Sequence, residues 1–423
     1  MRAAVVALGC PKNRVDSEYL LGVLAQSGYE LTFFPEEANL VVLTTCAFIK
    51  PAVIESEKTI RRLIALKRKN PAMKLVIAGC LFQRYKKTLP SRFPEVDHWV
   101  GLKDLLKIPQ IVNNQPSPFD FPAPLPRLLS TPTHYAYLKI ADGCNNNCRY
   151  CLIPKIRGPY RSRPIEELLI EAERLAQSGV KELILVAQDT TLYGTDIYQR
   201  PLLNRLIEKL SAIKKIQWIR LMYTHPKHLT PAVIEQFGFN PKLCRYIDLP
   251  IQHINDKILA RMNRGYSRKK VERLIERLRA IPEMRIRTTV ITGFPGETQD
   301  QFNELLNFIK QTQFDRLSGY TFFPETGTQA SRMKNQVKPQ TARFRLRQIL
   351  HTQGQISKNK LRQLIGKDIS VLVDFPGIGR TEWDAPEIDG IVKIKNGATP
   401  LGEYLNVRIL DASTHDLIAS PLK

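Results

Sequence analysis

Continuous apolar runs alternate with amphipathic stretches along the first part of the chain. Apolar runs lie at 5–8, 40–43 and 75–78, and helical patterns lie at about 16–28 and 52–69. Continuous apolar runs are typical of strands buried on both faces of a parallel sheet, whereas amphipathic helices repeat every three to four residues. This alternation predicts an α/β domain of βαβ units over residues 1–113.

A second alternation begins at residue 134 and predicts the central domain. Strand-like runs lie at 135–140, 181–187, 216–221, 245–250, 284–291 and 315–322, with helical patterns at about 164–177, 201–213, 230–237, 267–280 and 298–312. Six parallel strands are too few to close an eight-stranded barrel. We therefore expect an open, partial (βα)6 barrel over residues 134–360, with its chemistry on the loops that follow the strands.

The pattern changes at both ends of this domain. Residues 114–133 are rich in proline and predict a semi-rigid linker. After about residue 367, short strand-like runs at 368–374, 388–395 and 404–410 are separated by Pro-Gly, Asp-Gly and Asn-Gly turns. These features predict a small antiparallel β-barrel of the OB-like type over residues 361–423.

Three cysteines lie close together just after the first strand of the central domain. Cys144, Cys148 and Cys151 have the spacing Cys-x3-Cys-x2-Cys, and Tyr150 precedes the last of them. Three thiolates can hold three corners of a 4Fe-4S cluster and leave one iron open. The alternative, a structural zinc site, favours a fourth protein ligand. The triplet resembles the cluster loop of radical S-adenosylmethionine (SAM) enzymes, in which the open iron chelates SAM.

Three further cysteines each follow an apolar run of the N-terminal domain. They are Cys10, Cys46 and Cys80. Because the carboxyl ends of parallel strands meet at one edge of a sheet, we expect the three thiols to converge and to hold a second iron-sulfur cluster. The alternative is three small buried cysteines that fill the strand ends. Cys244 lacks such partners and is interpreted as a core or surface thiol.

The loops after the central strands carry the remaining candidates for contacts with the cofactor. Gln188, Asp189 and His253 offer hydrogen bonds to amino, carboxylate or ribose groups, and Gly293 and Gly296 allow close backbone approach to an adenosyl group. A single histidine after a strand is more often a satisfied structural residue. Tyr150 is expected to pack near the adenine, with a plain hydrophobic role as its alternative.

Charge and cysteine content narrow the class of protein. Among 423 residues, 63 Lys and Arg outnumber 40 Asp and Glu, which gives a net charge of +23. No acidic residue occurs within residues 332–367, so this segment predicts contact with RNA; a solvated charged face is the alternative. Seven cysteines, no recognisable secretory leader and no apolar run of about 20 residues favour a cytoplasmic protein without a membrane span.

Taken together, these motifs resemble the methylthiotransferases, a family of radical SAM enzymes, over essentially the whole chain. The resemblance rests on both cysteine sets, the terminal module, which corresponds to a TRAM domain, and motifs at 8–13, 134–140, 157–164, 187–194 and 325–328. Thr44 and Ala47 depart from the family pattern, in which Asn and Gly are common. These departures put the hydrogen bonding around Cys46 in doubt.

The resemblance implies a specific chemistry. It implies an enzyme that adds a methylthio group to the β-carbon of an aspartate in small-subunit ribosomal protein S-twelve. The enzyme would use two 4Fe-4S clusters, SAM and an external electron donor. We expect it to act on the protein within the assembled or assembling subunit. That C–H bond is unactivated, so polar acid-base catalysis does not suffice and a radical is required. The sister branch, which modifies a tRNA adenosine next to the anticodon, is the alternative. An RNA-binding scaffold without activity is a third hypothesis, and intact cysteine sets argue against it.

Overall fold

The computed structural model describes residues 1–114, 125–397 and 399–422. The chain forms two compact units. The first contains Met1–Thr131, Tyr137–Asn145 and Leu152–Glu171, and the second contains Pro132–Ala136, Asn146–Cys151 and Ala172–Lys423. The loop that carries the cysteine triplet therefore contributes Cys144 to the first unit and the other two cysteines to the second.

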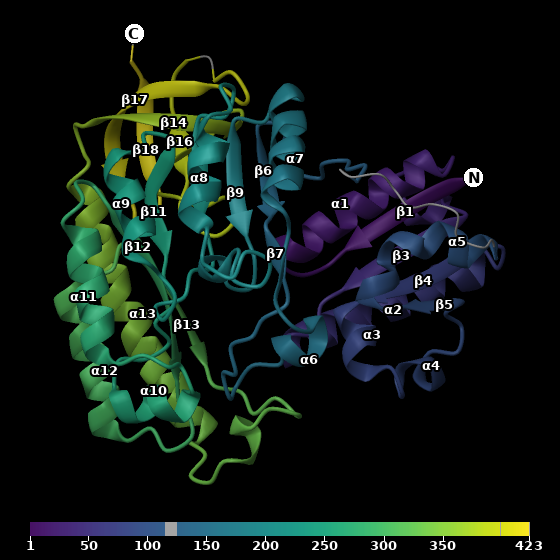
Figure 1. Ribbon diagram of the computed structural model, residues 1–423, viewed down its shortest axis with the longest axis horizontal. Coiled ribbons are helices and arrows are strands. Elements are labelled where there is room, and N and C mark those ends of the chain that lie inside the picture. The colour runs from purple at the N-terminus through teal and green to yellow at the C-terminus, as the bar shows by residue number, and fades with distance from the viewer. Residues whose placement is uncertain (115–124, 398, 423) are drawn as a thin grey trace. The chain divides into compact units, whose positions relative to one another are not determined.

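A five-stranded, all-parallel sheet forms the centre of the first unit (Figure 1). Its order is β2-β1-β3-β4-β5, with β1 at Arg2–Ala7, β2 at Glu30–Leu31, β3 at Leu40–Thr45, β4 at Lys74–Gly79 and β5 at His98–Val100. Its helices are α1 Pro11–Gln26, α2 Lys50–Lys69, α3 Cys80–Tyr85, α4 Leu89–Arg92, α5 Ile108–Asn113 and α6 Ile153–Arg157. Alternate residues of β3 belong to two separate hydrophobic clusters, so both faces of the sheet are buried, as its apolar runs predicted.

Helix α1 begins at Pro11, earlier than the predicted start near residue 16. The buried residues of its first turns are mostly polar, among them Lys12, Asn13, Asp16 and Ser17. The prediction relied on apolar residues repeating at helical spacing, and this part of the helix has no such repeat. Proline is well suited to the first helical position because its missing N–H would be unpaired there in any case. As a result, Cys10 is the N-cap residue of α1.

The predicted linker is only partly described. Residues 115–124 lie outside the described residues, but the segment after them is packed. Arg127 is 4% exposed and forms ion pairs with Glu18 and Glu171, each at 2.6 Å. Leu128 N donates to Glu18 O at 3.1 Å. This part of the segment is therefore held against α1 and is no free spacer.

A six-stranded sheet of order β13-β12-β11-β10-β9-β6 belongs to the second unit except for the residues of β6 from Tyr137 onward, which belong to the first. These strands are β6 Tyr135–Lys139, β9 Glu182–Val186, β10 Trp218–Leu221, β11 Leu243–Asp248, β12 Arg285–Thr292 and β13 Arg316–Thr321. The unit boundary divides α7 Ile165–Gln177 after Glu171. The other helices of the second unit are α8 Leu203–Ser211, α9 Pro231–Phe239, α10 Asp256–Met262, α11 Arg268–Arg279, α12 Gln299–Thr312 and α13 Pro339–Arg362. Each strand from β9 to β13 pairs in parallel with the next, and α13 lies against β13 and α12. This sequential order is that of the predicted open (βα)6 barrel.

The C-terminal segment closes into a five-stranded barrel of order β14-β15-β16-β18-β17. Its strands are β14 Asp368–Phe375, β15 Ile378–Thr381, β16 Val392–Ile394, β17 Tyr404–Ala412 and β18 Leu417–Pro421. The three predicted strands are present, but β15 and β18 were not predicted. Strand β15 contains the buried Arg380, which interrupts its apolar pattern. The pairing is antiparallel except between β16 and β18, which run parallel.

Candidate metal centre and cofactor site

The three N-terminal cysteines lie at one edge of the first sheet. Cys10 follows β1, Cys46 follows β3 and Cys80 begins α3 directly after β4, and these three strands are neighbours in the sheet. Gly9 has φ +101°, and a Cβ added to it would lie 2.8 Å from Cβ of Cys46. The close approach of these two loops therefore requires glycine. All three thiols are free of disulfides.

The thiols interact electrostatically with one another and with Arg157 of α6. Burial raises the pKa of Cys80 to about 12 and also raises that of Cys46, and in both cases Arg157 acts in the opposite direction. Burial also acts to raise the pKa of Cys10, but Lys12, Arg157 and backbone N–H groups at the start of α1 lower it overall. A converging set of three soft donors beside a cation has the chemistry of an iron-sulfur site with one open iron.

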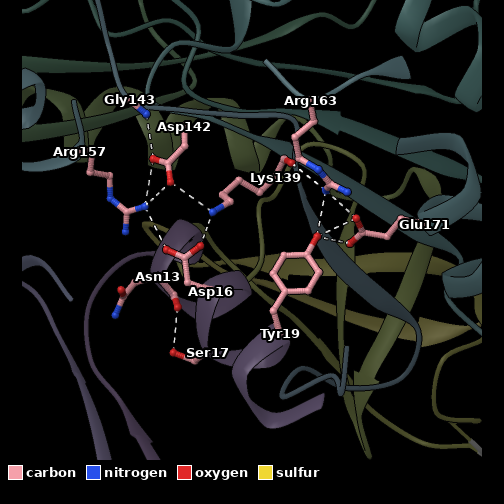
Figure 2. A network of polar contacts seen from close by, with 10 residues as sticks. All are labelled: Asn13, Asp16, Ser17, Tyr19, Lys139, Asp142, Gly143, Arg157, Arg163 and Glu171. Atoms are coloured by element: carbon pink, nitrogen blue, oxygen red, sulfur yellow. Dashed lines mark hydrogen bonds and ion pairs between the residues drawn. The ribbon is translucent and has the colours of Figure 1, made fainter. Parts of the chain in front are cut away.

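Arg157 is held by a buried network of charges, shown in Figure 2. Its Nη1 donates to Asp16 Oδ2 at 3.0 Å and to Asp142 Oδ2 at 2.9 Å. Lys139 also forms ion pairs with both carboxylates. Burial acts to raise the pKa of Asp142, but Lys139 and Arg157 hold it below its usual value. Nη2 of Arg157 is buried and has no hydrogen-bond partner among the described residues.

Cys144 is positioned by a tight contact between two loop segments of the first unit. Its N donates to Gly158 O at 3.1 Å. The preceding Gly143 has φ +74°, and a Cβ there would lie 2.1 Å from Pro159 O. A side chain at position 143 would therefore push the two segments apart, so glycine is needed to place Cys144.

Cys148 and Cys151 are positioned within the second unit. Cys151 N donates to Cys148 O at 3.0 Å, which closes a turn between them. Arg264 is 6% exposed, and its Nη1 lies 3.2 Å from Cys148 Sγ and 3.2 Å from Tyr150 Oη. Its other nitrogens donate to Pro250 O and Tyr266 Oη. This buried guanidinium therefore fixes the positions of Cys148 and Tyr150 relative to each other.

Tyr150 packs beside the cysteines against a small apolar cluster that contains Met262 and Phe294. Its ring meets that of Phe294 edge to face, with centroids 6.4 Å apart. This packing agrees with the plain hydrophobic role that was the alternative for Tyr150. Contact with an adenine remains a prediction.

Gln188 and Asp189 follow β9 and have different surroundings. Both polar atoms of the Gln188 side chain are buried without a hydrogen-bond partner among the described residues. Asp189 accepts from Thr191 N at 3.1 Å, from His228 Nδ1 at 2.8 Å and from Asn146 Nδ2 at 2.7 Å. Gln188 is thus available to a ligand, whereas Asp189 organises the residues around it.

His225 stacks on His228 with ring centroids 5.0 Å apart. Burial and the positive charge of Arg264 lower the pKa of His225 to about 2, so this imidazole is neutral at physiological pH. Ligand atoms of His225, His228 and Asp189 lie within 4.8 Å of one another. The adjacent Arg264 cation opposes a metal ion there, and the group is better suited to hydrogen bonding.

The other three predicted cofactor contacts have structural explanations. His253 is fully buried: its Nε2 lies 3.2 Å from Glu297 Oε1, and its Nδ1 accepts from Asn255 N at 3.0 Å. A Cβ on Gly293 would lie 2.4 Å from Cβ of Ala342, and one on Gly296 would lie 1.8 Å from Nη1 of Arg261. Close packing therefore explains both glycines, and contact of these residues with a cofactor stays a prediction.

Sequence reasoning included Arg157 only as part of the family motif at 157–164, without a role, and did not single out Arg264, His225 or His228 as functional side chains. The available signal for Arg264 was the sequence Asn263-Arg264-Gly265, because Asn and Gly favour turns. In the structure Asn263 has φ 57° and Gly265 has φ 68°. The signal for the histidines was their spacing of three residues after a strand. Neither pattern is specific without the fold.

Comparisons with known proteins cover all parts of the chain. Residues 2–101 match the uncharacterized protein family UPF0004, residues 138–309 match the radical SAM superfamily and residues 365–422 match the TRAM domain. The solved structure of the radical SAM methyltransferase TsrM from Kitasatospora setae, with cobalamin and a [4Fe-4S] cluster bound, has a TM-score of 0.57 at 14% identity. It covers 89% of this chain and 79% of that one, and it supports the fold alone.

Full-length relatives are more informative. The ribosomal protein uS12 methylthiotransferase RimO of Trichlorobacter lovleyi is 43% identical, with 100% of this chain and 98% of the relative covered. The protein of the same name from Geobacter sulfurreducens is 42% identical and covers 99% of this chain and 98% of its own length. That from Clostridioides difficile is 41% identical and covers 100% of this chain and 99% of its own length. The chain therefore belongs to the ribosomal protein uS12 methylthiotransferase family of radical SAM enzymes.

Proposed function

We propose that this enzyme adds a methylthio group to the β-carbon of one aspartate of ribosomal protein uS12. The observation that supports the proposal is similarity to uS12 methylthiotransferases along the whole chain, including the segments in which both cysteine sets and the terminal barrel lie. An unactivated C–H bond at that carbon excludes simple deprotonation by a side chain. The donor sets of this chain suit the required radical chemistry.

Each cysteine set would hold one 4Fe-4S cluster. The ligands would be Cys10, Cys46 and Cys80 for one cluster and Cys144, Cys148 and Cys151 for the other, with SAM at the open iron of the latter. When bound, these groups supply electron transfer, hydrogen abstraction and sulfur transfer, and an external reductant supplies the electrons.

The protein's own residues would bind and orient the cofactors and exclude water from them. Arg264 fixes Cys148 and Tyr150 from one side. Gln188 offers an amide to the polar groups of SAM, and Asp189 holds His228 and Asn146 in place. The neutral His225 accepts from Lys227 N at Nδ1, so its proton is on Nε2, which has no partner among the described residues and can donate one hydrogen bond in the same region.

RNA contact through residues 332–367 is part of the proposal. Two cations of this segment are already engaged: Arg345 Nη1 pairs with Glu297 at 2.8 Å, and Lys360 Nζ pairs with Asp315 at 2.8 Å. The exposed cations are Arg332, Lys334, Lys338, Arg343, Arg347, Lys358, Arg362 and Lys367. These attract phosphate and favour a uS12 molecule surrounded by ribosomal RNA over the free protein.

Mass spectrometry of modified products tests the assignment. The chain is expressed in a host that lacks its own methylthiotransferases, and uS12 and tRNA are both analysed, with Cys148→Ala as the inactive control. A methylthio group on the uS12 aspartate is expected. A methylthio group found on tRNA alone would overturn the proposal.

A competition between substrates tests the RNA contact. Purified enzyme is offered small subunits and isolated uS12 at physiological salt, and faster modification of the subunit is expected. Charge reversal at Lys358 and Arg362 should reduce that preference. Equal rates on both substrates would contradict RNA-assisted recognition.

A further inference from the structure

A second stretch of the chain without acidic residues lies in the first unit. No Asp or Glu occurs within residues 58–94, which include most of α2 and all of α3 and α4. In this respect the stretch resembles the basic segment 332–367. Its cations are Lys58, Arg61, Arg62, Lys67, Arg68, Lys69, Lys74, Arg84, Lys86, Lys87 and Arg92.

Helix α2 presents cations on the face opposite to the one that it buries. Ile60 and Leu63 are fully buried in a hydrophobic cluster against the sheet. Lys58, Arg62 and Lys69 are exposed, and their spacing of four and seven residues places them along one stripe of the helix. The core therefore uses the apolar face of α2, and the stripe of cations faces the solvent.

The short helix α4 packs against the same face of the sheet as α2 (Figure 1). Phe93, which follows α4, lies under two guanidinium groups: Cζ of Arg61 is 5.4 Å and Cζ of Arg92 is 5.5 Å from its ring centroid. Arg92 also pairs with Glu57 of α2 at 2.9 Å. The cations of the two helices therefore form one continuous surface.

The α2–α4 basic surface consists of the exposed cations Lys58, Arg61, Arg62, Arg68, Lys69, Lys86, Lys87 and Arg92. Among the described residues, two carboxylates pair with them: Glu57 with Arg61 and Arg92, and Glu95 with Arg68. Arg61 and Arg68 remain 62% and 71% exposed in these pairs. Such exposed pairs contribute little to stability, so phosphate groups can replace the carboxylates readily. The surplus of cations suits a polyanion.

A nucleic acid suits this surface better than an anionic membrane. A helix that lies on a membrane inserts its apolar face among the lipids, whereas the apolar face of α2 is packed in the core. The exposed apolar residues nearby, Phe48, Ile49 and Ile54, precede the stripe of cations. Contacts with RNA phosphates require only accessible positive charge, which this surface supplies.

We propose that the α2–α4 basic surface binds phosphate groups of ribosomal RNA in the small subunit. The inference goes beyond the RNA contact of residues 332–367, because those residues lie in the second unit. The choice of ribosomal RNA rests on the proposed function, in which the substrate uS12 is surrounded by that RNA. Phosphate contacts carry no sequence information, so this surface supplies affinity and orientation and does not select the target aspartate.

Filter binding of radiolabelled small subunits to the full chain tests the surface. The variant Lys58→Gln/Arg62→Gln/Lys69→Gln removes the stripe of charge from α2. Its affinity for small subunits should fall at least about tenfold at physiological salt, because three phosphate contacts are lost. The slope of the logarithm of affinity against the logarithm of salt concentration should decrease by about 2–3. The assay requires no turnover, so its result does not depend on catalysis.

A matched control separates this surface from total charge. Arg205→Gln/Lys209→Gln/Lys214→Gln removes the same charge from exposed positions on and just after α8, in the second unit and outside both acid-free stretches. This variant should keep most of the affinity and the wild-type salt slope, because these cations contact no phosphate.

Two further variants guard against a folding defect. Lys58→Arg/Arg62→Lys/Lys69→Arg keeps every charge of the stripe and should bind as the wild type does. Lys86→Gln/Lys87→Gln leaves α2 intact and should still reduce the salt slope by about 1–2. Thermal midpoints of all variants should match the wild type, because the changed side chains are exposed.

Several outcomes would count against these ideas. Unchanged affinity and salt slope after neutralisation of the stripe would overturn the inference, as would an equal loss in the α8 control. A stripe variant that lost affinity for bulk tRNA or for phosphatidylglycerol vesicles, but not for small subunits, would overturn the choice of partner. Absence of methylthiolated uS12 with the wild-type enzyme would instead overturn the proposed function, and the binding result would still report on the surface.

Discussion

Arg264 Nη1 lies 3.2 Å from Sγ of Cys148, although the two residues are 116 positions apart in the sequence. The guanidinium is buried and also reaches Tyr150 Oη, Tyr266 Oη and Pro250 O, so its position is fixed from several directions. Hydrogen bonds to cluster sulfurs and nearby charge are among the features that set the reduction potential of an iron-sulfur cluster. Arg264 is therefore placed to adjust the proposed SAM-binding cluster.

Replacement of Arg264 by Gln should lower the midpoint potential of that cluster, since a positive charge favours the reduced, more negative state. Reductive SAM cleavage should fall about tenfold, the effect of losing one charge-assisted hydrogen bond. A redox titration followed by electron paramagnetic resonance checks the potential. Arg277→Gln, at an exposed position of α11, is the control, and an identical potential in both variants would refute this role.

Cys46→Ala should separate the two cysteine sets. The variant should hold about half of the wild-type iron and still cleave SAM, yet form no methylthiolated product, because three thiolates are needed to retain the N-terminal cluster. Iron analysis and product mass spectrometry provide the measurement. Cys244→Ala removes a buried thiol outside both sets and should retain full iron and product; product formation by Cys46→Ala would exclude the second cluster.

His225 should make the stability of the second unit depend on pH. Its pKa is about 2 in the fold and about 6.5 when unfolded, so the folded state favours the neutral ring. Stability from this group is complete above pH 6.5 and falls as the pH decreases, by about 2 kcal/mol between pH 7 and pH 5. His225→Gln should reduce this pH dependence in urea unfolding experiments, whereas the exposed His351→Gln should not.

Glu182 should be critical for stability. It is fully buried and pairs with Arg220 at 2.6 Å and with Arg380, on β15, at 2.9 Å. Glu182→Gln leaves the buried Arg220 without a counter-charge, whereas Arg380 keeps its ion pair with Asp374, and the change should lower the free energy of unfolding by about 3–5 kcal/mol. Glu403→Gln, which breaks an exposed pair with Lys181, should cost at most about 1 kcal/mol. Similar losses in the two variants would contradict this reasoning.

The same carboxylate predicts an acid transition. Burial acts to raise the pKa of Glu182, but Arg220 and Arg380 lower it overall. Its stabilising effect is therefore present above the unfolded pKa of about 4.3 and is lost as the pH falls below that value. Denaturant midpoints measured from pH 6 to pH 3 should fall more steeply for the wild type than for Glu182→Gln.

Local patterns were sufficient to predict most strands and helices of the two α/β parts. The run at 284–291 became β12, and the pattern at 298–312 became α12, because apolar periodicity there reflects burial directly. Prediction was poorer where buried residues are polar. The early turns of α1 and the strand that contains Arg380 are stabilised by ion pairs and hydrogen bonds, which leave no apolar period in the sequence.

The sequence by itself determined where the thiols stand along the chain and that Cys10, Cys46 and Cys80 would gather at one sheet edge, because strand order and direction follow from the βα repeats. Only the tertiary structure decided which charges accompany them. Arg157 joins Asp16, and Arg264 joins Cys148, across more than a hundred residues of chain. Such pairs depend on how separate helices and loops pack, and that packing has no local signature in the sequence.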